Sequence, residues 1–302
     1  MAETPPPLTR YAWLSVATAV AVLALKLVAW KLTGSVGLLS DALESLTNVA
    51  GALMALLMLR LAAQPPDDEH AYGHTKAEYF SSGFEGMLIF LAAAVIVWQA
   101  LPRLWAPRAV EQAGLGLAVA AVATALNFAT ARVLARAGRL RKSISLEADA
   151  RHLMADVLTT VGVIVGVGLV ALTGWQRLDP LVALAVAANV LWEGYKLMGA
   201  SAMGLMDAAW PEDEQQILRA VLDEFRGRGA DFHALRTRRS AARRFVSFHV
   251  LVPGAWTVKQ GHDLVDALER RLSERLPGVT AFTHLEPADD PCSYNDEGLD
   301  RL

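Results

Sequence analysis

Six long apolar runs occupy the first two-thirds of the chain. Each run holds about 20 or more mostly apolar residues, the length that an α-helix needs to cross a bilayer. The runs lie at roughly Tyr11–Leu32, Val36–Ala62, Tyr79–Trp105, Gly114–Leu134, Ala148–Thr173 and Leu181–Met206. They predict a transmembrane domain of six α-helices over residues 11–206, preceded by a polar tail at residues 1–10.

The chain changes character after about Asp207. Apolar residues recur at helical spacing after Pro211, and short runs typical of strands follow. The predicted elements are a helix from Pro211, strands at Phe232–Arg238 and Phe245–Val252, a helix at Val258–Leu276 and a strand at Val279–Leu285. This order predicts a small α+β domain (α-β-β-α-β) over residues 207–287, with a tail at residues 288–302.

The composition fits a chain that is part membrane protein and part soluble domain. Hydrophobic residues make up 54% of the chain and its mean hydropathy is +0.32, which is high for a soluble enzyme and low for a chain embedded throughout. Cys292 is the single cysteine, which excludes a disulfide framework and a cysteine-rich zinc site. Any metal chemistry must therefore use His, Asp, Glu and Asn. The net charge of −3 favours no class of partner, and we expect no nucleic-acid partner.

Basic residues are distributed unevenly among the connecting loops. The loop between the fourth and fifth runs carries four Lys and Arg residues within residues 136–142, whereas the three loops on the opposite side carry four between them. An excess of Lys and Arg marks the cytoplasmic side of a membrane protein. We therefore expect both termini, and with them the α+β domain, on the cytoplasmic side of the cell (inner) membrane.

Two of the predicted membrane helices each carry a pair of polar residues spaced four apart. Glu44 and Asn48 lie in the second run, and His152 and Asp156 lie in the fifth. Residues at i and i+4 share one face of a helix, and ionisable groups are costly inside a bilayer. Two such pairs could close a four-coordinate N/O site, which suits zinc without being specific to it. The alternative is that these groups hydrogen-bond helices together, but two matching pairs favour a functional site.

Three further acidic residues lie in the predicted membrane helices. Asp41 precedes Glu44 by three residues and Asp149 precedes His152 by three, so each is a candidate accessory residue on a similar helix face. Glu85, in the third run, is either an ion-path residue or a structural hydrogen-bonding group. The spacing does not decide between these two roles.

The histidines outside the predicted membrane helices fall into two groups. His70 and His74 follow Asp67 in the acidic loop after the second run, which makes this loop a candidate surface metal site. The second group lies in the α+β domain and consists of His233, His249, His262 and His284, with Glu286 two residues after the last of them. Strands of one sheet could bring these residues together, although spacing alone slightly favours scattered surface histidines.

These segments together resemble the cation diffusion facilitator family over nearly the whole chain. The second-helix signature is matched by residues 35–48 (SVGLLSDALESLTN), the following loop by residues 67–78 (DDEHAYGHTKAE) and the fifth-helix motif by residues 148–156 (ADARHLMAD). Asp179-Pro180 matches the start of the sixth helix, and His233–Arg238 and His284–Glu286 resemble parts of the cytoplasmic domain. Several linked motifs in the right order make the resemblance specific.

The resemblance implies a secondary active transporter rather than an enzyme: a homodimer that exports divalent metal ions from the cytoplasm by proton antiport. It places Glu44, Asn48, His152 and Asp156 at the transport site. It places Asp67, His70 and His74 at a loop site. It places His233, His249, His262, His284 and Glu286 at a cytoplasmic centre that bridges the protomers in relatives.

The second-helix pair departs from the Asp/Asp or His/Asp pair of many relatives. With Glu44 and Asn48, the expected site holds two carboxylates, one amide oxygen and one imidazole. Harder oxygen ligands shift the preference toward Fe²⁺, Mn²⁺ or Co²⁺ relative to a histidine-rich zinc site. Zn²⁺ is the best single assignment for the ion, both as substrate and as regulatory ligand, with those three ions as alternatives.

Two other functions compete with transport. A membrane metal sensor that does not transport would need only the α+β domain, so the paired intramembrane ligands argue against it. The second is an intramembrane hydrolytic metalloenzyme, but the sequence lacks the His-Glu-x-x-His helix that metalloproteases use, and no nucleophile stands out.

Overall fold

The computed structural model describes residues 7–33, 36–106, 114–175 and 177–294. The side chains of some helical positions, including Asp41 and Glu44, lie outside the described part. The chain divides into two compact units, Met1–Ala202 and Met203–Leu302.

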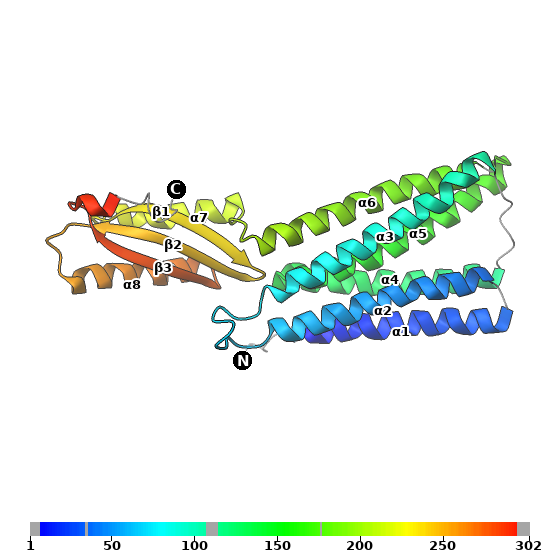
Figure 1. Ribbon diagram of the computed structural model, residues 1–302, viewed down its shortest axis with the longest axis horizontal. Coiled ribbons are helices and arrows are strands. Elements are labelled where there is room, and N and C mark those ends of the chain that lie inside the picture. The colour runs from blue at the N-terminus through cyan, green and yellow to red at the C-terminus, as the bar shows by residue number, and fades with distance from the viewer. Residues whose placement is uncertain (1–6, 34–35, 107–113, 176, 295–302) are drawn as a thin grey trace. The chain divides into compact units, whose positions relative to one another are not determined.

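Six long helices make up most of the described part of the first unit (Figure 1). They are α1 (Leu8–Thr33), α2 (Val36–Ala62), α3 (Ala77–Trp105), α4 (Gly114–Arg141), α5 (Ile144–Thr173) and α6 (Leu178–Leu205). Each predicted apolar run is confirmed as a helix. Within the described residues, four segments are long and apolar enough to cross a membrane: Leu8–Lys31, Ser45–Ala62, Ala77–Trp105 and Pro180–Leu205. The unit is thus a helical transmembrane domain, although four spans and not six satisfy this criterion.

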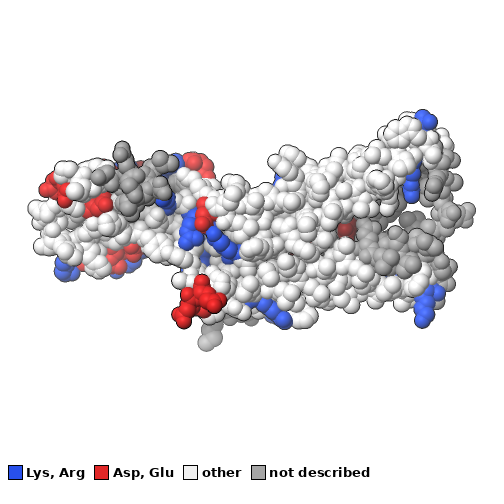
Figure 2. Space-filling view, viewed as in Figure 1, with Lys and Arg blue, Asp and Glu red and all other residues white. Residues whose placement is uncertain are grey.

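Charged side chains gather at the two ends of the helical unit, and the flank between them is nearly free of Lys, Arg, Asp and Glu in the view of Figure 2. Large apolar side chains of the helical unit are exposed, such as Phe90, Leu91 and Val95 of α3. Toward the end of α3, Trp98 and Trp105 are 80% and 76% exposed. Contiguous exposed apolar surface marks a membrane or protein contact, and Trp is enriched where a helix leaves the bilayer.

The junction between α4 and α5 differs from the prediction. α4 continues to Arg141 instead of ending near Leu134, and α5 begins at Ile144, so the basic segment predicted as a loop is mostly helix. Arginine lowers hydropathy but is a strong helix former, so the hydropathy profile ended the helix too early. Lys142 closes the turn in the left-handed region with φ 53°, and Ser143 N donates to the carbonyl of Gly138 at 3.0 Å.

α5 contributes to the two larger apolar clusters among the described residues of the helical unit. One cluster joins α1, α2, α4 and α5 and includes Leu56, Leu134 and Leu153. The other joins α3, α5 and α6 and includes Ile89 and Leu197. A polar residue on α5 can therefore face neighbours from either group of helices.

Small residues let α3 and α6 approach each other closely. A Cβ atom at Gly86 would lie 2.8 Å from the Met198 side chain, and one at Gly194 would lie 3.1 Å from Ile89. Glycine at such contacts is typical of helix pairs in membranes.

The second unit confirms the predicted α-β-β-α-β order. Its elements are α7 (Glu212–Arg226), β1 (Asp231–Ser240), β2 (Arg243–Val252), α8 (Val258–Arg275) and β3 (Val279–Pro287), followed by the 3₁₀ helix η1 (Pro291–Tyr294). The strands form a small mixed sheet in the order β1-β2-β3, in which β1 pairs antiparallel with β2 and β2 pairs parallel with β3.

The apolar core of this unit lies between one face of the sheet and the helices α7 and α8. Val246 and Phe248 of β2 belong to it, together with Leu218 of α7 and Leu268 of α8. Successive side chains of a strand point to opposite faces. His249 therefore lies on the sheet face that the core does not use.

A buried ion pair joins β2 to α7. Arg244 donates two hydrogen bonds to the carboxylate of Glu214, at 3.0 and 2.7 Å, and a third to the carbonyl of Pro277 at 2.8 Å. The two charged side chains are 7% and 9% exposed. Since each charge has its partner, the pair is a structural feature of the core rather than a candidate site.

Candidate metal-binding sites

The polar residues predicted in the second and fifth membrane helices meet inside the helical unit. His152 Nε2 lies 2.9 Å from Asn48 Oδ1, and Asn48 Nδ2 donates a short hydrogen bond to Asp156 Oδ2. Asn48 and His152 are buried and Asp156 is half-buried. α2 and α5 thus bring together three of the four predicted transport-site residues. The side chains of Glu44 and Asp41 lie outside the described part.

These three side chains offer a mixed set of metal donors. The cluster contains an imidazole nitrogen, an amide oxygen and a carboxylate, all within one hydrogen-bonded group. Such N/O donors suit Zn²⁺ and other divalent transition metals. We refer to Asn48, His152 and Asp156 below as the bundle cluster.

Two other predicted accessory residues are buried near the bundle cluster. Glu85 of α3 has no exposed surface, and its Oε2 lies 3.5 Å from Nδ1 of His152. Asp149 is 2% exposed and lies about one turn before His152 on α5. Glu85 therefore faces the ring nitrogen that does not face Asn48.

Buried hydrogen bonds fix α3 against α5. Near the start of both helices, the hydroxyl of Ser143 donates to Glu78 Oε2 at 2.5 Å, and Ser145 N donates to the same oxygen at 3.4 Å. About two turns further along each helix, Glu85 meets His152. The two helices therefore run parallel, in a register that places the Glu85 carboxylate opposite the imidazole.

Sequence reasoning missed the serines that support this register. Ser81 and Ser145 are fully buried and hydrogen-bond through their hydroxyls at 2.9 Å. The available signal was the matched spacing of polar residues on the two helices, from Glu78 to Glu85 and from Ser145 to His152. This matched spacing predicts the contacts only once α3 and α5 are known to be neighbours.

The loop between α2 and α3 brings Asp67, His70 and His74 together. Asp67 Oδ1 lies 3.3 Å from His70 Nδ1, and its Oδ2 lies 3.3 Å from His74 Nε2. The backbone N–H of His70 donates to Asp67 at 2.6 Å, and this bond holds the pKa of the carboxyl below its ordinary value. One ligand atom from each residue lies within 4.8 Å of the others, which is compatible with one metal ion.

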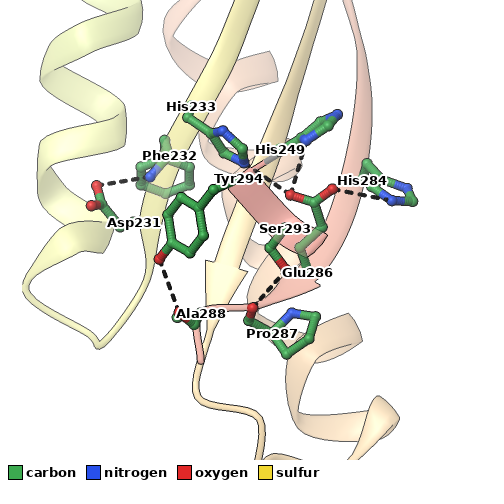
Figure 3. Close-up of polar contacts among 10 residues, drawn as sticks. All are labelled: Asp231, Phe232, His233, His249, His284, Glu286, Pro287, Ala288, Ser293 and Tyr294. Carbon is green, nitrogen blue, oxygen red and sulfur yellow. Dashed lines mark hydrogen bonds and ion pairs between the residues drawn. The ribbon is translucent and has the colours of Figure 1, made fainter. Parts of the chain in front are cut away.

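Neighbouring strands place three histidines in one row across the sheet. His233 on β1 pairs with His249 on β2, which pairs with His284 on β3. Glu286 lies two residues further along β3, on the same sheet face. Its Oε2 lies 2.9 Å from both His233 Nε2 and His249 Nδ1, and its Oε1 lies 3.5 Å from His284 Nε2 (Figure 3).

The carboxylate of Glu286 is the common partner of this group, which we call the sheet cluster (His233, His249, His284 and Glu286). One ligand atom from each of His233, His249 and Glu286 lies within 4.8 Å of the others, and His284 is added from the rim with a side chain that is 67% exposed. His262 lies on α8, where it is exposed and is not part of the metal-compatible groups of the described residues. Its assignment to a metal centre stays a prediction.

Sequence reasoning gave no role to the C-terminal tail, part of which lies against the sheet cluster. The ring of Tyr294 lies 6.0 Å from that of His233 (Figure 3). The hydroxyl of Tyr294 donates to the carbonyl of Ala288 at 2.9 Å, and Ser293 Oγ donates to the carbonyl of Pro287 at 2.7 Å. These bonds fold η1 back onto the end of β3, a contact that no spacing pattern encodes.

Two family models match the chain, and they meet near the boundary between its two units. Residues 12–206 match the cation efflux transmembrane domain, and residues 210–288 match the cytoplasmic domain of cation efflux proteins, which carries the designation ZT_dimer. The chain belongs to the cation diffusion facilitator family. Cation diffusion facilitators are membrane transporters of divalent metal cations, so the protein belongs to a transporter family and not to a class of enzymes.

Two relatives of this cation diffusion facilitator match it over most of its length, and a solved structure matches a smaller part of it. An uncharacterized transporter, sll1263, of Synechocystis sp. is 51% identical over 284 residues, which cover 94% of this chain and 92% of that one. The cation-efflux pump FieF of Serratia proteamaculans is 34% identical over 285 residues, or 93% of each chain. A solved structure of CzrB in a Zn form is 42% identical and covers 26% of this chain and 90% of that one, with a TM-score of 0.25.

Proposed function

We propose that this protein exports divalent transition-metal cations from the cytoplasm in exchange for protons. The observation that carries the proposal is the buried contact among Asn48, His152 and Asp156 within the helical membrane unit. Buried polar groups in a membrane domain are costly and are retained mainly for function. A sensor that did not transport would need no metal donors at this place.

The geometry of His152 supports exchange for protons. An amide oxygen only accepts hydrogen bonds. As Asn48 is oriented here, the proton in the 2.9 Å contact therefore belongs to Nε2 of His152. In a His152 that carries a proton on both ring nitrogens, an ion that binds Nε2 expels the Nε2 proton from the site, because metal ligands bind in their deprotonated form, and the Nδ1 proton stays in place. Protons entering from a more acidic exterior would in turn displace the ion.

We assign Zn²⁺ as the substrate, with Fe²⁺, Mn²⁺ and Co²⁺ as alternatives. The proposed ligands are Glu44, Asn48, His152 and Asp156. A four-coordinate set with an imidazole suits Zn²⁺, while its oxygen-rich character admits the harder ions. The loop residues Asp67, His70 and His74 and the sheet cluster with His262 would bind metal in a regulatory role.

We further propose that all six long helices cross the cell (inner) membrane, with both termini in the cytoplasm. α4 and α5 have 28 and 30 residues, more than the about 20 that a span requires. Their arginines and acids lower the hydropathy without shortening the helices. The ZT_dimer designation of the second domain supports a homodimer.

The proposal is tested by reconstituting the protein in liposomes and measuring Zn²⁺ flux driven by a pH gradient. We expect Asp156→Ala to reduce the flux to that of protein-free liposomes, because it removes a charged ligand. Asp68→Ala, which changes an exposed acid of the α2–α3 loop, is the matched control and should leave the flux unchanged. Flux retained by Asp156→Ala would show that the bundle cluster is not the transport site. The same assay with Fe²⁺, Mn²⁺ and Co²⁺ decides the substrate.

A further inference from the structure

Glu85 is a fully buried acid that the proposed ligand set does not use. Neither of its carboxylate oxygens has a hydrogen-bond partner of normal length among the described residues. The same is true of Nδ1 of His152. These unpartnered groups face each other, with Glu85 Oε2 lying 3.5 Å from Nδ1. A shift of a few tenths of an ångström brings them to hydrogen-bond length.

The surrounding helices hold this carboxylate in place. On α2, Gly51 leaves the space that the carboxylate fills: a Cβ atom there would lie 2.7 Å from Oε1 and 2.9 Å from Oε2. On the α3–α5 side, the bonds from Ser143 and Ser145 to Glu78 set the register that brings the acid to the imidazole. Contacts from α2 and α5 thus surround the Glu85 carboxylate, which α3 carries.

The two nitrogens of His152 face different partners. Nε2 faces Asn48, which is bonded to Asp156, whereas Nδ1 faces Glu85. The lone pairs of the two ring nitrogens point apart, so a carboxylate at Nδ1 is not placed to bind an ion held at Nε2. Metal-binding histidines usually donate their second N–H to a carboxylate or carbonyl, which fixes the ring orientation and raises the basicity of the ligand.

We infer that Glu85 is a positioning residue of the transport site, which accepts a hydrogen bond from Nδ1–H of His152 and thereby directs Nε2 toward the transported ion. The inference rests on the proposed function. It resolves the two roles that the sequence leaves open for Glu85, because the acid is neither a ligand nor only a link between helices.

Transport kinetics of the full chain with Zn²⁺ test this assignment. Loss of a carboxylate behind a metal-bound histidine typically weakens metal affinity or activity about 10–100-fold. We expect Glu85→Ala to raise the KM for Zn²⁺ by about that factor. Glu85→Gln keeps an acceptor oxygen and should raise the KM less. Ser82→Ala, which changes another fully buried polar residue of α3, is the matched control and should keep the wild-type KM.

Gly51→Ala provides a test that leaves Glu85 itself intact. The added methyl group displaces the carboxylate, so this variant should raise the KM in the same direction as Glu85→Ala, even if Glu85→Ala fails to fold. In ¹⁵N-histidine-labelled, Zn²⁺-loaded protein, the Nδ1–H signal that disappears in His152→Gln should be protected from exchange in the wild type and lost in Gly51→Ala. A wild-type KM and an unchanged Nδ1–H signal in Gly51→Ala would overturn the inference. Absence of flux of Zn²⁺, Fe²⁺, Mn²⁺ and Co²⁺ in the wild type would instead refute the proposed function.

Discussion

The bundle cluster and the sheet cluster use similar side chains on very different scaffolds. In the bundle, the donors come from two helices and are closed in by a third, and His152 and Asn48 are 3% and 6% exposed. In the sheet, the donors come from three adjacent strands, and the side chain of His284 is 67% exposed. Two of the three residues of the bundle cluster are therefore buried within the chain, whereas the sheet cluster remains open along one side.

This difference has a chemical consequence. In the bundle, an arriving ion would replace hydrogen bonds that already satisfy buried groups, and we propose that its binding there is coupled to the loss of a proton. At the sheet, water can exchange with the ion and a further ligand can approach from outside the domain. The enclosed bundle cluster suits a transport site. The open sheet cluster suits a regulatory site that senses the metal concentration in the surrounding solution.

The largest expected effect separates the two clusters by removing one imidazole from each. His152→Ala removes the nitrogen that faces Asn48, and we expect Zn²⁺ flux at the level of protein-free liposomes. His284→Ala removes an exposed ligand at the rim of the sheet cluster and should keep most of the flux at saturating Zn²⁺. Flux is measured with equal amounts of reconstituted protein. Equal flux in the two variants would contradict the assignment of transport to the bundle cluster and of regulation to the sheet cluster.

A smaller effect is expected where a buried charge supports the fold rather than a metal site. Glu214→Ala leaves Arg244 buried without its partner, and breaking such a pair typically costs about 3–5 kcal/mol. Glu212→Ala breaks an exposed pair with Arg219 and should cost only about 0–1 kcal/mol. Hydrogen exchange of the β2 amides in the full-length protein measures the difference. Similar protection in both variants would mean that the Arg244 pair is not a main support of the domain.

The smallest effect concerns an exposed ion pair between α7 and α8. Arg271 donates hydrogen bonds to Glu224 at 2.9 and 3.2 Å and holds the pKa of that carboxyl below its ordinary value. For an acid with a lowered folded pKa, the contribution is complete above the unfolded pKa of about 4.3 and is lost as the pH falls through the folded value. Thermal melting as a function of pH should therefore show less loss of stability below about pH 4 in Glu224→Gln than in the wild type. A difference that instead developed between about pH 6 and 7, where histidines titrate, would point to the clusters.

The sequence predicted the candidate site best where the proposed ligands follow the helical repeat. The four-residue spacing of His152 and Asp156 predicts a shared helix face in any fold, and the structure places both at Asn48. It could not show that Glu85 meets His152, because that contact depends on which helices are neighbours and on their register. Hydropathy likewise misjudged the end of α4, since arginine is unfavourable in a hydropathy scale and favourable in a helix.

The sheet cluster likewise could not be predicted from residue spacing, because it depends on which strands are neighbours. The strands carrying His233, His249 and His284 were predicted nearly to their ends, yet spacing alone favoured scattered histidines. Their alignment depends on the pairing of β1 with β2 and on a parallel β3, which enters the sheet only after α8. A register shift of one residue would have placed His249 on the core face. The row of histidines is therefore a product of tertiary pairing.

The turn between α4 and α5 bears on how the bundle can move. Lys142 and Ser143 alone connect the two helices, and the Ser143 hydroxyl is bound to Glu78 at the start of α3. The turn therefore links the end of α4 with the starts of α3 and α5. While these contacts hold, the helices can separate only by rotating about that end, so the displacement would be small there and would grow along each helix. In such a rotation the ends of α3, α4 and α5 farthest from the turn would move the most.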